Sequence, residues 1–227
     1  MATNYESLEN SEIRLRNMFY AYYDHVLKTQ EILLQKLKNN KKITHADFDE
    51  IRDLENMSNQ KEAEIMDEGL WMISKENPKA NHLRFVMAIL YSIKDLERMS
   101  DYVYTITQFL STSKSVTVKI QQIFSEAFEK SYELNKIYYS LIQDASASIF
   151  YSEAQEIEKH YQEEYALIAR KITDILFKAK EEYSTNAYIG LVTALKHVER
   201  TIDHAINIVE NFIYIKQSTF FFEKQKK

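Results

Sequence analysis

Two stretches of the sequence repeat one charged pattern, K-x-x-E-R-x-x-D. The acidic positions are Glu97 and Asp101 in the first copy, and Glu199 and Asp203 in the second. Residues four apart lie on one face of a helix, so each copy builds a pair of carboxylates that repel each other. Oxygen donors of this kind suit hard or borderline cations such as iron, manganese, zinc or magnesium. The alternative is a solvated helix face, neutralised by the lysine and arginine of each copy.

Polar residues also occur in the middle of the helical segment that precedes each copy. If that segment runs antiparallel to the motif helix, its polar side chains converge with the carboxylate pair. We expect the following partners: Glu55, Asn59 and Glu62 for the first copy, and Glu156, His160 and Glu163 for the second. Each half would then hold an oxygen-rich group with at most one imidazole, which is a candidate metal site.

Other chemistry finds little support in the residues. A ferritin-like di-iron site needs Glu-x-x-His, and none of the six histidines has a glutamate three positions before it. With only Gly69 and Gly190, no phosphate-binding loop, dinucleotide fingerprint or G-x-S-x-G elbow can be written. The chain has no cysteine. His204, beside Asp203, is a lone acid or base candidate that is more typical of packing. We therefore predict no catalytic residues and no organic cofactor.

The segments that carry these residues are expected to be helical almost throughout. The 227 residues include two glycines and one proline, which leaves little material for tight turns. Apolar residues recur at three and four positions, the amphipathic helical period. Thr44 is expected to cap the second helix, and Asn77 the third, with Pro78 in its first turn. The predicted helices cover about 7–38, 44–76, 78–110, 116–144 and 148–182, and a sixth begins near Ser184 or Asn186 and runs to about 224.

The order of segments repeats: a helix, a helix with a polar centre, then an apolar helix carrying the motif. The third helix is apolar on more than one face, so we expect it to be central and buried. The sequence thus predicts an all-α fold of two tandem antiparallel three-helix bundles, with repeats at 1–112 and 113–227.

Charge and hydropathy limit the partners. A net charge of −5 gives no attraction to nucleic acid. No apolar run reaches the roughly 18–20 residues of a membrane span, and the first residues lack a signal-peptide pattern, which favours a cytoplasmic protein. The Phe220-Phe221-Phe222 stretch is expected to pack on a neighbour or a dimer mate; the alternative is an exposed aromatic patch that docks on a partner or on a membrane surface.

The segments around both motifs resemble the PhoU family of phosphate-signalling proteins. Residues 77–85, Asn-Pro-Lys-Ala-Asn-His-Leu-Arg-Phe, lead into Asp-Leu-Glu-Arg-Met-Ser-Asp at 95–101. This is similar to the family's Q-P-x-A-x-D-L-R followed by L-E-R-I-G-D-H. The second motif is followed by Asn-Ile-Val-Glu-Asn-Phe-Ile-Tyr at 207–214, which looks like the family's N-I-x-E-x-x-I-Y segment.

The resemblance implies a cytoplasmic, non-enzymatic negative regulator of phosphate uptake. Family members link the ATPase subunit of the phosphate ABC transporter to a membrane sensor histidine kinase, many form homodimers, and they approach the membrane through partners only. Some bind metal, such as iron, zinc or manganese, through their E(D)-x-x-x-D motifs. These motifs fall on Glu97 with Asp101 and Glu199 with Asp203, and less directly on the helix-two pairs Glu55 with Asn59 and Glu156 with His160.

The sequence also departs from the family pattern. Ser100 and Ile202 stand where the family has a glycine before the motif aspartate, and the bulky Ile202 is expected to hinder a metal cluster in the second half. Two alternatives to the regulator remain open at this point. One is an accessory protein of another ion transporter, and the other is a metal-storage protein or metal-dependent enzyme that uses the carboxylates.

Overall fold

The computed structural model describes residues 5–39, 41–114, 116–144, 147–178 and 185–217. Within these ranges the chain forms helices and no strand. The helices are α1 (Tyr5–Lys38), α2 (His45–Lys75), α3 (Asn81–Thr112), α4 (Val118–Asp144), α5 (Ala147–Lys178) and α6 (Thr185–Gln217). The predicted all-α class is confirmed. Phe220, Phe221 and Phe222 lie outside the described residues, so the packing predicted for them stays a prediction.

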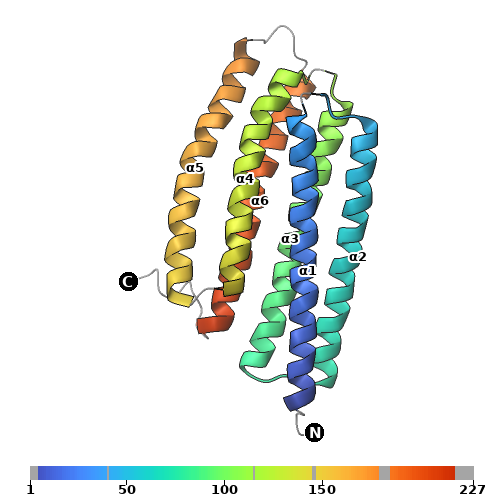
Figure 1. Ribbon diagram of the computed structural model, residues 1–227, viewed down its shortest axis with the longest axis vertical. Coiled ribbons are helices and arrows are strands. Elements are labelled where there is room, and N and C mark those ends of the chain that lie inside the picture. The colour runs from blue at the N-terminus through green and yellow to red at the C-terminus, as the bar shows by residue number, and fades with distance from the viewer. Residues whose placement is uncertain (1–4, 40, 115, 145–146, 179–184, 218–227) are drawn as a thin grey trace.

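Consecutive helices run up and down along one long axis (Figure 1). The middle of the molecule is formed by α1, α3, α4 and α6, with α3 against α6 and α1 against α4. The two helices with polar centres lie at opposite edges: α2 packs on α1 and α3, and α5 packs on α4 and α6. Each motif helix therefore lies between the other half of the molecule and its own edge helix.

The apolar core consists of two clusters that follow one another along the bundle. The first is built around Phe19, Leu96 and Ile208, and the second around Leu37, Ile106 and Val198. Both clusters draw residues from each half of the chain, so the two three-helix sets share one core. Helix α3 is central and contributes buried residues along its whole length, as predicted. The division at residue 112 stays a prediction about the internal duplication.

The start of α2 is capped as the sequence predicts. The Thr44 hydroxyl accepts a hydrogen bond from the Asp47 amide at 3.2 Å, and the Asp47 carboxylate accepts one from the Thr44 amide at 2.8 Å. This reciprocal capping box satisfies two amides that the first turn of a helix leaves without partners. The Asp47 carboxylate also accepts from Lys36 Nζ at 2.6 Å, which ties the end of α1 to the start of α2.

The predicted start of α3 is wrong. Helix α3 begins at Asn81, three residues beyond Pro78, and neither Asn77 nor Ala80 caps it with a side chain. Asn77 and Ala80 both have positive φ, 50° and 48°, so the chain makes two left-handed bends around Pro78 instead of entering a helix there. Asparagine tolerates this conformation, whereas an alanine in it is strained.

Helices α3 and α6 approach closely near the end of the bundle. A Cβ atom added at Gly190 of α6 would overlap the Phe109 ring of α3, so this position requires glycine for its lack of a side chain. None of the helices, taken over the described residues, combines the length and the apolar character that a bilayer crossing requires.

Candidate functional site

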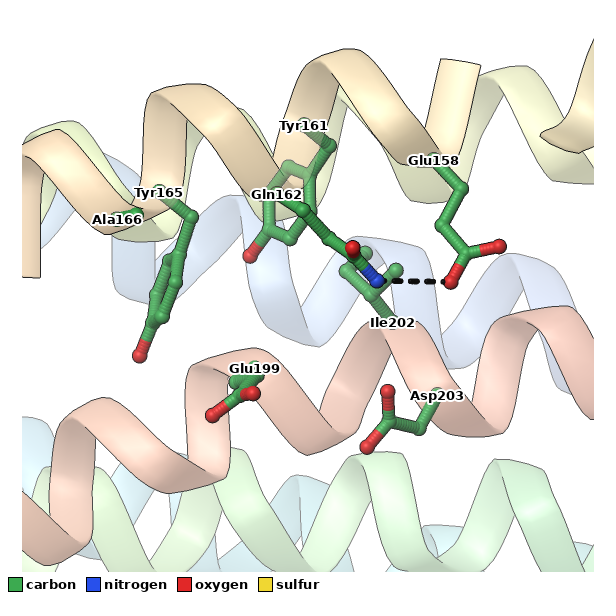
Figure 2. Close-up of a pocket in the computed structure, with 8 residues that line it drawn as sticks. All are labelled: Glu158, Tyr161, Gln162, Tyr165, Ala166, Glu199, Ile202 and Asp203. Atoms are coloured by element: carbon green, nitrogen blue, oxygen red, sulfur yellow. Dashed lines mark hydrogen bonds between the residues drawn. The ribbon is translucent and has the colours of Figure 1, made fainter. Parts of the chain in front are cut away.

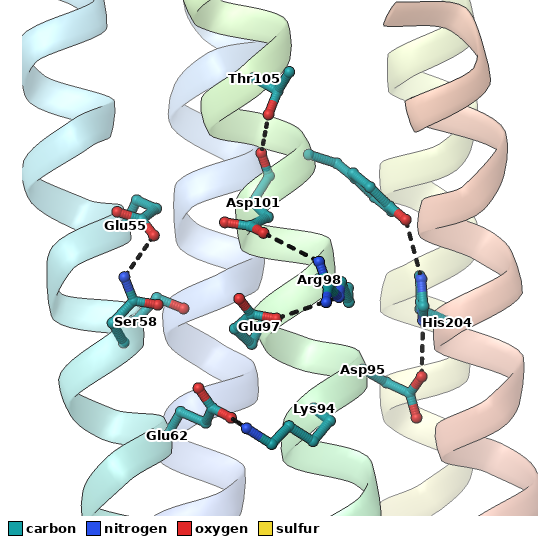
Figure 3. Close-up of polar contacts among 12 residues, drawn as sticks. Glu55, Ser58, Glu62, Lys94, Asp95, Glu97, Arg98, Asp101, Thr105 and His204 are labelled. Atoms are coloured by element: carbon teal, nitrogen blue, oxygen red, sulfur yellow. Dashed lines mark hydrogen bonds and ion pairs between the residues drawn. The ribbon is translucent and has the colours of Figure 1, made fainter. Parts of the chain in front are cut away.

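The first motif lies where α3 faces α2. On α3, Leu96, Met99 and Ser100 point into the core, which leaves Glu97 and Asp101 half-buried at the edge of the α2–α3 contact. Figure 3 shows these two carboxylates directed toward the same stretch of α2, from which Glu55 and Glu62 face them. The predicted approach of the α2 acids to the first motif therefore occurs.

Cations of the chain itself lie on these carboxylates. Lys94 Nζ crosses from α3 to form an ion pair with Glu62 of α2, whose side chain is only 14% exposed. Arg98 lies between the motif acids, with Nε 3.6 Å from a Glu97 oxygen and Nη1 3.7 Å from an Asp101 oxygen. Figure 3 shows both arrangements. A guanidinium group thus lies beside both motif acids, and an ammonium group lies on the facing acid of α2.

Glu55 and Asn59, the predicted pair on α2, form a hydrogen bond with each other. Asn59 Nδ2 donates to Glu55 Oε1 at 2.6 Å, and Asn59 is exposed. Ser58, between them, is fully buried and shares a hydrogen bond of 2.9 Å with the Tyr22 hydroxyl. The side of α2 that faces Glu97 and Asp101 therefore carries Glu55, Ser58 and Glu62, and Asn59 contributes through Glu55.

The crowding of acids changes the titration of Glu97. Burial raises the pKa of Glu97, and the nearby charges of Asp101 and Glu62 raise it further, while Arg98 and Lys94 oppose the shift. The cations do not fully compensate, so this carboxyl group is easier to protonate than an exposed glutamate.

The second motif lines a pocket between α5 and α6. Its volume is about 370 Å³. The residues that line it are Glu158, Tyr161, Gln162, Tyr165 and Ala166 of α5, and Glu199, Ile202 and Asp203 of α6. Figure 2 shows Glu199 and Asp203 on α6, with the side chains of Glu158, Tyr161, Gln162 and Tyr165 extending from α5 on the other side of the pocket. Ile202 is buried and forms part of the wall.

The α5 residues predicted to meet the second motif do not line this pocket. Glu156 and His160 are exposed, and Glu158 takes the place expected for an acid. The reason is the buried face of α5, which is fixed by Tyr161 and Tyr165: Glu158 lies three residues before Tyr161, on the same face, whereas Glu156 and His160 point elsewhere. Successive residues of an α-helix are turned by about 100°, so Glu156 and His160, each two residues from Glu158, point to other sides of α5.

The spacing of the tyrosines carried the signal that would have found Glu158. Ser58 and Glu62 face the first motif, and Glu158 and Gln162 occupy the matching places facing the second. The sequence prediction aligned the two edge helices one residue away from this register. The apolar residues of α5, rather than its acidic residues, indicate which face is buried and therefore give the correct register.

Like charges shift the titration of the second site as well. Burial raises the pKa of Asp203, and Glu199 raises it further, against the lowering effect of Lys196, His204 and Arg200. Burial also raises the pKa of Glu158, with Asp203 adding to the shift. Both carboxyl groups are therefore held in surroundings that disfavour their negative charge.

His204 has a structural role at the contact between the two halves. Its Nδ1 lies 2.8 Å from Asp95 Oδ1 of α3 (Figure 3). Its Nε2 lies 3.2 Å from the Tyr102 hydroxyl. Because Asp95 can only accept, Nδ1 carries the proton, and a neutral ring then accepts from Tyr102 through Nε2. Asn207 Nδ2 also donates to Asp95, at 3.2 Å. This polar seam joins α3 to α6 beside both motifs.

The carboxylates fit a bare metal ion poorly in either half. Among the residues that the structure describes, no three His, Asp or Glu side chains lie close enough together to hold a metal ion. In the first half Lys94 and Arg98 already neutralise the acids, and in the second the acids are spread along a pocket. Metal binding by Glu97, Asp101, Glu199 and Asp203 stays a prediction.

Comparisons with known proteins find that the chain is similar to PhoU proteins. Residues 24–110 match the model of the PhoU domain. The chain is similar to the uncharacterized protein MG409 of Mycoplasma genitalium, with 29% identity over 222 residues that cover 96% of this chain and 98% of that protein. It is also 24% identical, over 75% of its length and 70% of the relative, to a phosphate-specific transport system accessory protein PhoU homolog of Pseudomonas aeruginosa.

A solved structure shares the fold over nearly the whole chain. The crystal structure of the phosphate transport system regulatory protein PhoU from Streptococcus pneumoniae superposes with a TM-score of 0.65 at 18% identity. The match covers 94% of this chain and 98% of that one. The predicted resemblance, in sequence and in fold, is confirmed.

Proposed function

Because the chain is a relative of the PhoU proteins in sequence and fold, we propose that it regulates phosphate uptake through contacts with other proteins. Its target is the ATPase subunit of a phosphate ABC transporter. It keeps the phosphate-starvation response off when phosphate is plentiful, together with a sensor histidine kinase where the cell has one. In this role the protein is a cytoplasmic homodimer that reaches the membrane through its partners.

The observation that carries the proposal is the match over the whole six-helix body. A regulator that works by contact needs a rigid, extended surface and no reaction centre. The shared core fixes the two edge helices α2 and α5 on opposite sides of the molecule. The names of the relatives, an accessory protein and a regulatory protein of phosphate transport, support phosphate over another ion as the transported species.

The proposal is tested by co-purification from the native cell. A tagged chain, expressed at its normal level, should carry the phosphate transporter ATPase with it, in larger amounts when phosphate is abundant. The ATPase subunit of an unrelated ABC transporter in the same lysate is the control. Enrichment of that other ATPase instead would point to a different ion transporter.

A second measurement addresses the regulation itself. Deletion of the gene should raise phosphate uptake and the expression of starvation genes in phosphate-rich medium, and the intact gene should restore both. Normal uptake and normal expression in the deletion strain would contradict the proposal. Neither result depends on metal binding, which is measured separately as the metal content of the wild type against Glu97→Ala with Asp101→Ala.

A further inference from the structure

The two copies of the charged motif end in different states, although their sequences match. In the first copy, Lys94 crosses to the neighbouring helix and pairs with Glu62, and Arg98 serves both motif acids. In the second copy, Lys196 stays on its own helix and pairs with Glu199 at 2.6 Å. Within the described residues neither Glu158 nor Asp203 forms an ion pair. One site is closed by cations of the chain, and the other is open.

A single difference on the edge helices explains this. Glu62 of α2 attracts the lysine across the helix contact, whereas α5 presents a neutral amide, Gln162, in the matching place. The Gln162 amide donates to Glu158 Oε1 at 3.0 Å, so it orients that carboxylate without neutralising it. Within the described residues Glu158 and Asp203 of the second site therefore have no cation at ion-pair distance, whereas Glu62, Glu97 and Asp101 of the first site do.

The open site also has a buried acceptor without a partner. Tyr161 is only 7% exposed, and its hydroxyl forms no hydrogen bond of regular geometry, although the Ser131 hydroxyl lies near it. The nearby Ser131 hydroxyl donates instead to the Val198 carbonyl, at 3.4 Å. Figure 2 shows the Tyr161 and Tyr165 rings directed from α5 toward α6, on the side of Glu199. A buried hydroxyl left without a partner costs about 1–3 kcal/mol, so its place in the pocket wall points to a missing ligand.

We propose that the pocket between α5 and α6 binds a linear polyamine, with one ammonium group between Glu158 and Asp203 and another beside Glu199, Tyr161 and Tyr165. In the first half of the same molecule a primary ammonium, that of Lys94, lies on Glu62, so a contact between an edge helix and a motif helix accommodates such a group. This inference goes beyond the regulatory function proposed above and does not depend on it.

The shape of the pocket favours a chain with two charges over a single ion. Glu199 and Asp203 are four residues apart, which separates their attachment points by about 6 Å along α6. Three or four methylene groups, with carbon–carbon bonds of about 1.5 Å, bridge such a distance. A volume of about 370 Å³ is far larger than one metal ion needs, and the acids do not converge on one point.

The walls also suit an alkyl ammonium chain. The Tyr161 and Tyr165 rings stack with centroids 5.7 Å apart and offer aromatic surface to methylenes and to a cation. Ile202 supplies an apolar contact. The Tyr161 oxygen, as an acceptor, would gain the hydrogen bond that it lacks. Glu210, half-buried and close enough to Glu158 for their charges to interact, adds negative potential. Lys196 must leave Glu199 for the second ammonium to bind.

The test is isothermal titration calorimetry of the purified full-length protein with spermidine and with putrescine at low salt. We expect one spermidine per chain, with weaker binding as salt is raised. Asp203→Asn and Tyr161→Phe should each weaken binding, the former by about tenfold because a charged hydrogen bond is lost. Tyr161→Phe removes only the hydroxyl without a partner, so the fold should be unaffected. Asp101→Asn, the matched change in the closed first half, should bind as the wild type does.

Several results would overturn the assignment. Absence of spermidine binding at millimolar concentration is one. Equal losses in Asp203→Asn and Asp101→Asn would reduce the effect to general attraction by an acidic protein. Unchanged binding in Tyr161→Phe would show that the buried hydroxyl does not contact the ligand. Displacement of spermidine by an equal concentration of Mn²⁺ or Mg²⁺ would identify the pocket as a metal site. Circular dichroism of every variant excludes unfolding as the cause of a loss.

Discussion

The polar seam between α3 and α6 should hold the two halves together measurably. The side chains of Asp95 and His204 are 15% and 22% exposed, so their hydrogen bond of 2.8 Å is largely shielded from water. A hydrogen bond to a charged group contributes about 1.5–3 kcal/mol. Asn207 continues to donate to Asp95 when the imidazole is removed, which softens the loss. We therefore expect a coupling free energy of about 1.5 kcal/mol between Asp95 and His204.

A double-mutant cycle measures this coupling. Asp95→Ala, His204→Ala and the double variant are unfolded with urea, and the free energy of unfolding is read from far-ultraviolet circular dichroism with the slope checked for two-state behaviour. The control cycle uses Asp49 and Arg52, an exposed pair on α2 with an N–O distance of 2.9 Å. That pair should show a coupling of about 0.5 kcal/mol or less.

Two outcomes of the double-mutant cycle would contradict the expected role of the polar seam. If Asp95 and His204 couple no more strongly than Asp49 and Arg52, the seam is a solvated contact and the two halves are held by apolar packing alone. If the double variant unfolds in two separate transitions, the halves are independent units, and the division near residue 112 describes folding domains as well as sequence repeats. A single transition with a coupling near the expected value supports one cooperative six-helix body.

The remaining predictions concern local features of the helices. Burial tends to raise the pKa of Asp47, but hydrogen bonds from Lys36 and Thr44 outweigh it and lower the pKa. The stability that Asp47 adds is therefore present above its unfolded pKa of about 4 and is lost as pH falls through the folded value. Asp47→Asn should cost about 1 kcal/mol in urea unfolding at pH 7, and the difference from wild type should shrink below about pH 4; a constant difference would contradict the pairing. Ala80→Gly should raise the free energy of unfolding by about 1 kcal/mol, since it relieves a positive φ, and a lower thermal midpoint would argue against strain there. Gly190→Ala should lower that free energy by about 1–3 kcal/mol through overlap with the facing α3 ring, and an unchanged thermal midpoint would mean that the ring moves aside freely.

Much of the fold follows from features that act locally. The scarcity of glycine and proline favours long helices over tight turns, and the period of the apolar residues indicates the buried face of each helix. The capping box at Thr44 involves only residues three apart, so the sequence was sufficient to predict it. The sequence was not sufficient to predict the start of α3. The expected Asn77 cap requires an extended backbone, and the chain adopts a left-handed bend there instead.

The edge helix α5 was harder to place because its polar segment contains many acidic residues. Any of several glutamates between 153 and 164 could face the motif if the helix were rotated about its axis. The rotation is decided by tertiary packing, in which Tyr161 and Tyr165 are drawn against α4 and α6. The positions of the acidic residues do not indicate that packing, whereas the positions of large amphipathic side chains such as tyrosine indicate which face is buried.

The divergence of the two motifs shows the same limit at the level of single charges. Both copies contain the same lysine, arginine, glutamate and aspartate at the same spacing, so a local interpretation assigns them the same chemistry. What separates them is a residue on another helix: Glu62 recruits Lys94 across the contact, and Gln162 leaves Lys196 on its own helix. A repeated motif therefore fixes where carboxylates lie, and the facing helix decides whether they are satisfied within the chain or remain available to a ligand.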